Sequence, residues 1–246
     1  MTTITSPHNP RLKELRKLVR RRERERSGRF LAEGEDLVAA ATAAGRPAIA
    51  GYRAAGTAIG GDGFEDVEQS VMASLSTLGS GTRAIGVYEQ CFTKPVGPLC
   101  VYLHGVGDPG NVGAVLRSAL AFGASCVALG PGCADPHSPK AVRASMGAIF
   151  ALELARVGDV DELPGTRVAL VAGAGEPIWD VRPTQALTLL VGAEREGLPD
   201  DVVEACERVA HIPISSESLN AAMAATVALY EMTRGGRDND DRVPSS

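Results

Sequence analysis

The fold is decided by one stretch near the end of the chain, Ile212-Pro-Ile-Ser-Ser-Glu-Ser-Leu-Asn-Ala-Ala-Met-Ala-Ala-Thr-Val-Ala-Leu-Tyr230. A short apolar run over residues 209–214 stops at a polar turn, and an alanine-rich helix follows. Ser218 or Asn220 can cap this helix, because either side chain accepts hydrogen bonds from first-turn amides. The alanines indicate that other backbones pack closely around the helix. We therefore expect a helix packed on more than one side, with polar groups at its start.

Two loops upstream share this arrangement of polar residues after an apolar strand. The first, residues 104–113, runs into a helix that carries Asn111 near its N-cap and Arg117 almost two turns later. The second, residues 192–199, follows a buried strand and places Glu194 close to the strand end. Ligands of open α/β sheets bind beyond the carboxyl ends of the strands. The sequence therefore predicts that the three loops form one site.

From residue 97 onward, apolar strands alternate with helical patterns. Such alternation predicts a mostly parallel sheet covered by helices on both faces. The expected strands are 99–103, 126–129, 149–155, 168–172 and 187–191, and the expected helices are 111–122, 139–146 and 199–205.

The N-terminal part has a different pattern, which predicts a small α/β domain followed by a linker over residues 91–98. Leucines at helical spacing predict one amphipathic helix over 9–26. Residues 30–34 read as a strand and turn, and 35–44 as a helix closed by Gly45. The tail, residues 235–246, has the composition of a disordered segment.

Charge is strongly asymmetric along the chain. Residues 1–29 hold ten Lys or Arg against three acids, a net charge of +7, so the remainder carries −12 of the total of −5. This asymmetry favours an anionic partner at one end of the molecule. The sequence shows no apolar run of the roughly 18 residues that a membrane span needs and no signal core. The five cysteines form no Cys-x-x-Cys pair, so we expect a cytoplasmic protein with free thiols.

Three ordered motifs together resemble the SpoU (TrmH-like) RNA ribose 2′-O-methyltransferases of the SPOUT superfamily. They are Asn111-x-Gly113 with Arg117, then Gly192-x-Glu194-x-x-Gly197-Leu198, then Ile212-Pro213 with Ser218-Leu219-Asn220. The segment Ser138-Pro-Lys-Ala-Val-Arg-Ala-Ser-Met-Gly147 also resembles that family. Residues 1–93 are similar, less specifically, to its L30e-like RNA substrate-binding domain.

The resemblance implies a domain organisation, a cofactor and partners. Residues 97–234 would form the SPOUT α/β domain with a deep trefoil knot, an exception to unknotted topology. The cofactor would be S-adenosylmethionine, the substrate RNA would be ribosomal rather than transfer RNA, and the protein would be a homodimer that needs no metal.

The resemblance also assigns residues to roles. Arg117 matches the catalytic arginine, and Asn111, Glu194, Ser218 and Asn220 match the other polar motif residues. Backbone around four residues would hold the cofactor: Gly192, Leu198, Ile212 and Leu219. The basic residues expected to contact RNA are Arg11, Lys13, Arg16, Lys17, Arg20 and Arg143.

One residue departs from the family pattern, and two other functions stay open. The residue before the motif glutamate is commonly Asn, and here it is Ala193. The first alternative is a non-catalytic RNA-binding or ribosome-assembly protein. The second is an NAD(P)-linked Rossmann enzyme built on Gly105-x-Gly107-x-x-Gly110, although Pro109 removes an amide that could bind a pyrophosphate. For His104, His137 and His211, whose spacing fits no metal site, we expect local hydrogen bonds.

Overall fold

The computed structural model describes residues 3–77, 81–181, 185–215 and 218–237, which fall into two compact units. Unit 1 consists of Met1–Cys91 together with Asp135–Ala151. Unit 2 consists of Phe92–Ala134 together with Leu152–Ser246. The main division lies near the expected linker, but the segment 135–151 belongs to unit 1 rather than to the C-terminal part of the chain.

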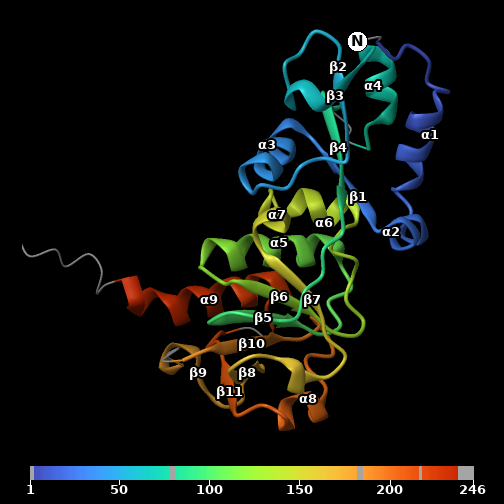
Figure 1. The fold of residues 1–246 in the computed structure, drawn as a ribbon. Coiled ribbons are helices and arrows are strands. Elements are labelled where there is room, and N and C mark those ends of the chain that lie inside the picture. Colours follow the sequence, from blue (N-terminus) through green and yellow to red (C-terminus); the bar gives the residue numbers. More distant parts are fainter. Residues whose placement is uncertain (1–2, 78–80, 182–184, 216–217, 238–246) are drawn as a thin grey trace, which may run out of the picture. The chain divides into compact units, whose positions relative to one another are not determined.

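Unit 1 is built on a four-stranded sheet with the order β1-β4-β2-β3 (Figure 1). Strand β4 pairs antiparallel with β1 and β2, and β3 pairs parallel with β2. The strands are β1 (Arg29–Glu33), β2 (Ala50–Ala54), β3 (Phe64–Val67) and β4 (Ala84–Glu89), and a 3₁₀ turn, η1, covers Gly61–Gly63. The helices are α1 (Pro10–Lys17), α2 (Arg21–Ser27), α3 (Glu35–Ala43), α4 (Gln69–Leu75), α6 (Pro139–Ala144) and α7 (Ala148–Ala151).

The single N-terminal helix expected over 9–26 is wrong, because the chain forms two helices, α1 and α2, with a break between them. Asn9 caps α1, and Arg20 has extended dihedral angles before α2 begins. The buried guanidinium of Arg24 donates to the carbonyls of Leu18 and Val19 at 3.0 and 2.7 Å. Because the helix is interrupted here, these two carbonyls are able to accept hydrogen bonds from the buried guanidinium. Helical periodicity in the sequence does not reveal that Arg24 is buried.

The segment 135–151 joins unit 1 through buried contacts at both of its ends. Asp135 accepts from the Nε and Nη2 of Arg24 at 2.9 and 2.6 Å, and both side chains are almost fully buried. Phe150 stacks on Phe30 with ring centroids 5.9 Å apart. The expected strand over 149–155 is therefore only half correct: residues up to 151 form α7, and the strand that follows, β7, covers Glu153–Arg156.

Unit 2 contains a seven-stranded sheet with the order β7-β6-β5-β10-β8-β11-β9, in which all pairs are parallel. This confirms the predicted mostly parallel sheet. Besides β7, its strands are β5 (Leu99–Leu103), β6 (Cys126–Leu129), β8 (Thr166–Leu170), β9 (Glu176–Pro177), β10 (Leu187–Val191) and β11 (Arg208–His211). The sheet has its crossover point between β5 and β10, where sequence order reverses.

Helices cover both faces of this sheet, as expected from the fully buried central strands β5 and β10. Helices α5 (Pro109–Ala121) and α9 (Ala221–Arg237) pack together on one face, and α8 (Asp200–Glu204) lies on the other (Figure 1). On the α8 side, Val202 packs with alternate strand residues such as Cys100 and Tyr102. Short 3₁₀ turns cover Val160–Glu162 (η2) and Ile178–Asp180 (η3).

The end of α9 differs from the expectation of a disordered tail over 235–246. The helix continues through Gly235 and Gly236 to Arg237. The remainder of that expected tail, 238–246, lies outside the described residues. Within the described part of the chain, none of the helices combines the length and the apolar character that a membrane crossing requires.

Candidate functional site

The three predicted loops meet at a polar cluster formed by Asn111, Glu194 and Asn220. The side-chain amides of both asparagines donate to the same oxygen of Glu194, Oε1. The Asn220 amide lies 3.2 Å from that oxygen and 3.2 Å from Asn111 Oδ1. All three side chains reach the surface. One residue from each motif therefore contributes to a single hydrogen-bonded group in unit 2.

Another residue caps helix α5, so the side chain of Asn111 can take part in this cluster. The N-cap of α5 is Asp108, whose Oδ1 accepts from the backbone amides of Gly110 and Asn111 at 2.7 and 3.1 Å. Asn111 therefore lies near the N-cap, as expected, three residues after Asp108 and in the first turn of the helix. Because Asp108 satisfies the first-turn amides, the Asn111 side chain is available to Glu194. An aspartate directly before proline at a helix start is the sequence signal that could have identified this cap.

On the opposite loop, Asn220 caps α9 and faces Glu194 at the same time. Its Oδ1 accepts from the amides of Ala222 and Met223 at 3.0 and 3.3 Å. With the oxygen engaged by the helix, its Nδ2 group points to Glu194. Of the two caps considered from the sequence, Asn220 is therefore the one in the structure. Ser218 is exposed and lines the neighbouring cleft.

Glycines shape the loop that carries Glu194. Ala193 and Gly197 exchange two backbone hydrogen bonds of 3.1 and 3.0 Å, which close the loop around Glu194. A Cβ at Gly192 would lie 2.1 Å from the carbonyl carbon of Gly197, so only glycine fits there. Gly197 has a φ of +71°, which glycine adopts at no steric cost. In this chain, where alanine replaces an amide at 193, Asn111 and Asn220 orient the carboxylate.

A cleft of about 690 Å³ opens beside the cluster at the carboxyl ends of β8 and β10. Its size lies within the range of small-molecule sites. The predicted cofactor-binding residues all line it: Gly192, Leu198, Ile212 and Leu219. Glu194 and Ser218 also line it, so the cleft and the polar cluster are contiguous. The apolar residues of this lining, together with a glycine that admits no Cβ, leave room for a ligand to approach the main chain closely.

Arg117 and Arg143 lie outside the hydrogen-bonded cluster. Arg117 is exposed on α5, and within the described residues its side chain makes no hydrogen bond or ion pair. Its charge is therefore available to an external group. Arg143 belongs to unit 1, where its Nη2 donates to Thr77 Oγ1 at 3.2 Å.

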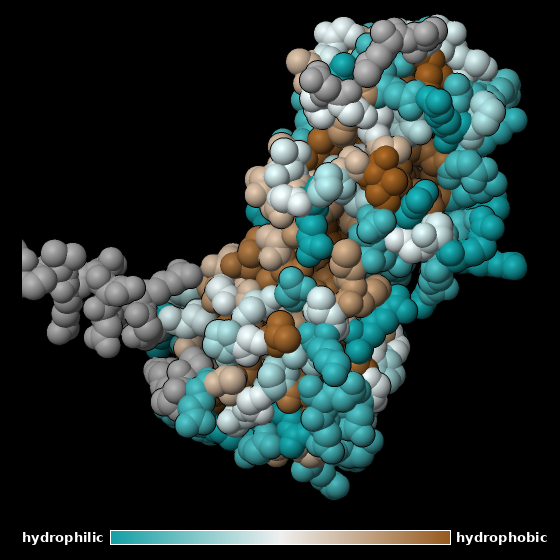
Figure 2. All heavy atoms as spheres, viewed as in Figure 1, coloured by the Kyte–Doolittle hydropathy of each residue, from teal (hydrophilic) through white to brown (hydrophobic). Residues whose placement is uncertain are grey.

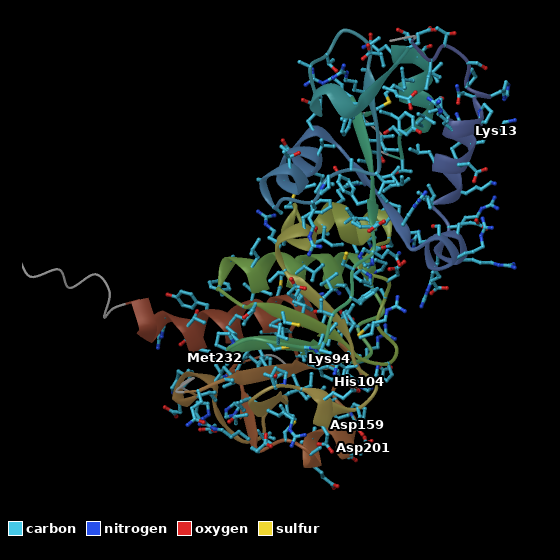
Figure 3. All side chains as sticks on the ribbon, in the orientation of Figure 1. Lys13, Lys94, His104, Asp159, Asp201 and Met232 are labelled. Atoms are coloured by element: carbon cyan, nitrogen blue, oxygen red, sulfur yellow. The ribbon has the colours of Figure 1, made fainter. Side chains whose placement is uncertain are left out.

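The three histidines occupy separate places. His104 Nδ1 lies 3.0 Å from the Tyr102 hydroxyl, in a second cavity that also contains Asp159 and Asp201 (Figure 3). Burial raises the pKa of Tyr102 to about 12, with nearby thiols and carboxylates adding to the effect. His137 packs on Phe30 in unit 1, and His211 lines a hollow beside the cleft that Gly192 and Leu198 line. Among the described residues, no cluster of three or more His, Cys, Asp or Glu could hold a metal ion.

Two parts of the chain match two family models. Residues 98–230 match the SpoU rRNA methylase family, and residues 9–80 match the MRM3-like substrate binding domain. An uncharacterized tRNA/rRNA methyltransferase of Synechocystis is 30% identical over 95% of this chain and 94% of its own length. The 23S rRNA (guanosine(2553)-2′-O)-methyltransferase RlmP of Bacillus subtilis is 27% identical over 94% of this chain and 99% of its length.

Solved structures agree with these relatives. The AdoMet-bound rRNA methyltransferase from Sinorhizobium meliloti superposes with a TM-score of 0.84 at 30% identity. The match covers 95% of this chain and 98% of that one.

Fold and site together define an α/β protein with a cleft of small-molecule size beyond the carboxyl ends of parallel strands, next to a polar cluster. Within that class, the chain belongs to the SpoU rRNA methylase family and is a methyltransferase that acts on RNA.

Proposed function

We propose that this protein transfers a methyl group from S-adenosylmethionine to a ribose 2′-hydroxyl of ribosomal RNA. The observation that carries the proposal is the Asn111–Glu194–Asn220 cluster, which joins all three motifs at the mouth of the cleft. The cofactor, when bound, supplies a methyl group that is already activated on a sulfonium. The protein therefore has to supply position and control of the hydroxyl proton.

Gly192, Leu198, Ile212 and Leu219 would hold the cofactor against the strand ends. The acceptor ribose would then lie at the open side of the cleft, where Glu194 and Ser218 are exposed. Glu194 has one carboxylate oxygen engaged by two amides, which fixes the orientation in which the carboxylate would accept a hydrogen bond from a ribose hydroxyl. Ser218 lies on the same wall and can donate to the substrate.

Arg117 would bind the phosphate next to the target ribose and stabilise the alkoxide that develops on the 2′-oxygen. The family resemblance assigns the proton-accepting role to this arginine. However, a guanidinium has a pKa above about 12 and is a poor base. Replacing Arg117 with Ala should abolish methylation and leave cofactor affinity unchanged. Full activity of this variant would remove Arg117 from the mechanism.

The basic surface of α1 and α2 is proposed to contact the RNA backbone, and Figure 2 shows hydrophilic residues along these helices. Several cations there already have partners: Arg11 pairs with Glu65, Lys17 with Glu14, and Arg16 donates to Pro7 and Ser74. Lys13, which lies at the outer side of α1, and Arg20 form no ion pair with any described residue (Figure 3). We expect these two residues to make stronger phosphate contacts than the paired ones.

The resemblance to this family supports three further proposals, which concern the role of unit 1, the knot and the location of the protein in the cell. We propose that unit 1, apart from residues 135–151, is an L30e-like substrate-binding domain. Unit 2 would hold the trefoil knot, and the protein would act in the cytoplasm. The close packing of α9, with Ala225 and Ala228 fully buried, supports a tightly enclosed C-terminal helix.

A homodimer is supported by an apolar surface on α5 and α9. Met223, Val227 and Tyr230 follow one another at helical spacing and are 63%, 37% and 50% exposed. Tyr230 contacts Phe122 at the end of α5, and Leu120 on α5 is also exposed. A second copy of this chain would cover these side chains. Light scattering should show a dimer for the native chain and a monomer for Met223→Asp/Tyr230→Asp.

The test of the proposed function is to map ribose 2′-O-methylation in total RNA from cells with and without the protein. One ribosomal RNA position should lose its methyl group in the absence of the protein and regain it on complementation. A non-catalytic RNA-binding protein would leave every position unchanged. Titration with S-adenosylmethionine and with NAD(P)H would separate the proposal from a Rossmann enzyme.

A further inference from the structure

Met146 combines a strained backbone with an exposed side chain. Among the described residues it is the only non-glycine residue with a positive φ, +49°. Methionine enters this left-handed region at a steric cost that glycine does not incur. Its side chain nevertheless lies largely in solvent, with the residue 55% exposed. Strain of this kind persists only where the surroundings impose it, and it concentrates at functional sites.

The surroundings do impose the backbone conformation. The Met146 amide donates to the carbonyl of Arg143 at 3.1 Å, and Ala148 donates to Ser145 at 3.0 Å, so the turn joins α6 directly to α7. The backbone of the next residue, Gly147, lies close to α3, since a Cβ added there would lie 2.5 Å from Ala40 Cβ. The fold therefore requires a left-handed residue at 146, but nothing in unit 1 requires its side chain to be methionine.

The charges around Met146 indicate the kind of partner. Lys140 and Arg143 are exposed on α6, and the stretch from Ser138 to Gly147 contains no acidic residue. Arg143 donates to Thr77 Oγ1 at 3.2 Å, and that hydroxyl donates in turn to the carboxylate of Glu33 at 2.6 Å, which fixes the guanidinium at one edge of this stretch. Met146 follows these two cations by six and three residues in the chain. An apolar, polarisable side chain in a basic stretch suits a ligand that presents a flat ring together with negative charge. Nucleotides of single-stranded RNA have both features, and thioethers contact ring systems favourably.

We propose that Met146 is an RNA-contacting residue whose side chain packs against an unstacked base of the substrate, while Arg143 and Lys140 contact the adjacent phosphates. This inference rests on the proposed function, because it assumes an RNA substrate. It assigns the exposed side chain at position 146 to substrate recognition, whereas the backbone conformation of the turn is set by the fold.

The test uses three variants of the full chain: Met146→Gly, Met146→Leu and Ile49→Ala. Met146→Gly removes the side chain and relieves the strain. Met146→Leu keeps an apolar group. Ile49 is another exposed apolar residue of unit 1, 41% exposed, and serves as the matched control. The measurements are affinity for an unmodified transcript of large-subunit ribosomal RNA, the rate of methylation, the melting temperature and the oligomeric state.

We expect Met146→Gly to bind the transcript about five- to tenfold more weakly, the size of one lost apolar contact. Its melting temperature should stay within about 2–4 °C of the native value or exceed it, because the strain is removed. Met146→Leu and Ile49→Ala should bind RNA like the native chain. A stable Met146→Gly variant with native RNA affinity would overturn the inference, and so would a loss of affinity that follows only from a changed oligomeric state. If the native chain itself methylated no RNA, the proposed function would fail first.

Discussion

Asn220 and Glu194, 26 residues apart in the chain, are joined by a hydrogen bond of 3.2 Å from the asparagine Nδ2 to the carboxylate Oε1. The same asparagine caps α9 through its Oδ1. The side chain of Asn220 thus positions both the start of α9 and the candidate catalytic carboxylate of Glu194. A change at Asn220 should therefore affect both the stability of α9 and the orientation of Glu194.

Replacing Asn220 with Asp separates these two roles. An aspartate keeps an oxygen for the helix cap, which is favourable at a helix N-terminus. It cannot donate to Glu194 and places a second negative charge beside it. We expect a melting temperature close to the native value and a kcat lowered by about 10²-fold, the typical cost of losing one oriented polar contact in an active site. Native kcat in this variant would contradict the role of the cluster.

Gly192→Ala should close the cofactor cleft. The new Cβ would lie 2.1 Å from the carbonyl carbon of Gly197, so the loop around Glu194 must shift. We expect affinity for S-adenosylmethionine to fall by at least about tenfold, because this glycine lines the cleft. Gly158→Ala is the matched control in unit 2, since a Cβ there meets no atom within 4 Å. Calorimetric titration measures both variants, and equal affinities would refute the steric argument.

The buried Arg24–Asp135 pair should hold the segment 135–151 in unit 1. Arg24→Met leaves the carboxylate buried without its cation, which costs about 3–5 kcal/mol of unfolding free energy. The double variant Arg24→Met/Asp135→Leu should recover much of that loss, because no uncompensated charge remains. Chemical denaturation measures both. The exposed pair Lys17–Glu14 is the control, and Glu14→Gln should cost at most about 1 kcal/mol.

The Arg167–Glu207 pair links β8 to the start of β11 and should give a pH-dependent contribution to stability. Hydrogen bonds from the Arg167 side chain lower the pKa of Glu207 to about 2. The ordinary value in an unfolded chain is about 4.3. The contribution is therefore present above about pH 4.3 and disappears as the pH falls through about 2. Because Glu207 is 48% exposed, solvent screening keeps the effect small.

The corresponding variant is Glu207→Gln. It should melt below the native chain at pH 7, and the difference should vanish near pH 2. Glu204→Gln, at an exposed position of α8, should show no such trend. A difference between Glu207→Gln and the native chain that did not change with pH would exclude the ion pair as its cause.

Strands buried on both faces were predictable from the sequence. The bounds of β5, β6 and β10 agree with the apolar runs, because a strand covered by helices on both sides needs apolar residues throughout. The convergence of the three loops was predictable for a related reason, since the carboxyl ends of parallel strands share one edge of the sheet.

Features that depend on distant contacts were not predictable. The break between α1 and α2 exists because Arg24 bonds to carbonyls and to Asp135, 111 residues away. Helix α7 replaces the start of an expected strand because Phe150 packs on Phe30 and Tyr88. The hydrogen bonds that orient Glu194 likewise come from residues 83 positions before it and 26 after it. The pattern of apolar and polar residues within one segment contains no information on which distant residues will form hydrogen bonds or pack together.

The central claim is that the protein methylates a ribose 2′-oxygen, and that the cleft and its polar cluster are the site of this reaction. The most direct measurement incubates the purified protein with unmodified large-subunit ribosomal RNA and S-adenosylmethionine labelled in the methyl group. Alkaline hydrolysis of the RNA then locates the label, since hydrolysis requires a free 2′-hydroxyl. We predict that the label appears in an alkali-resistant dinucleotide and is lost in the Glu194→Ala variant. Label on a base, or no transfer at all by a protein that binds both cofactor and RNA, would contradict the account.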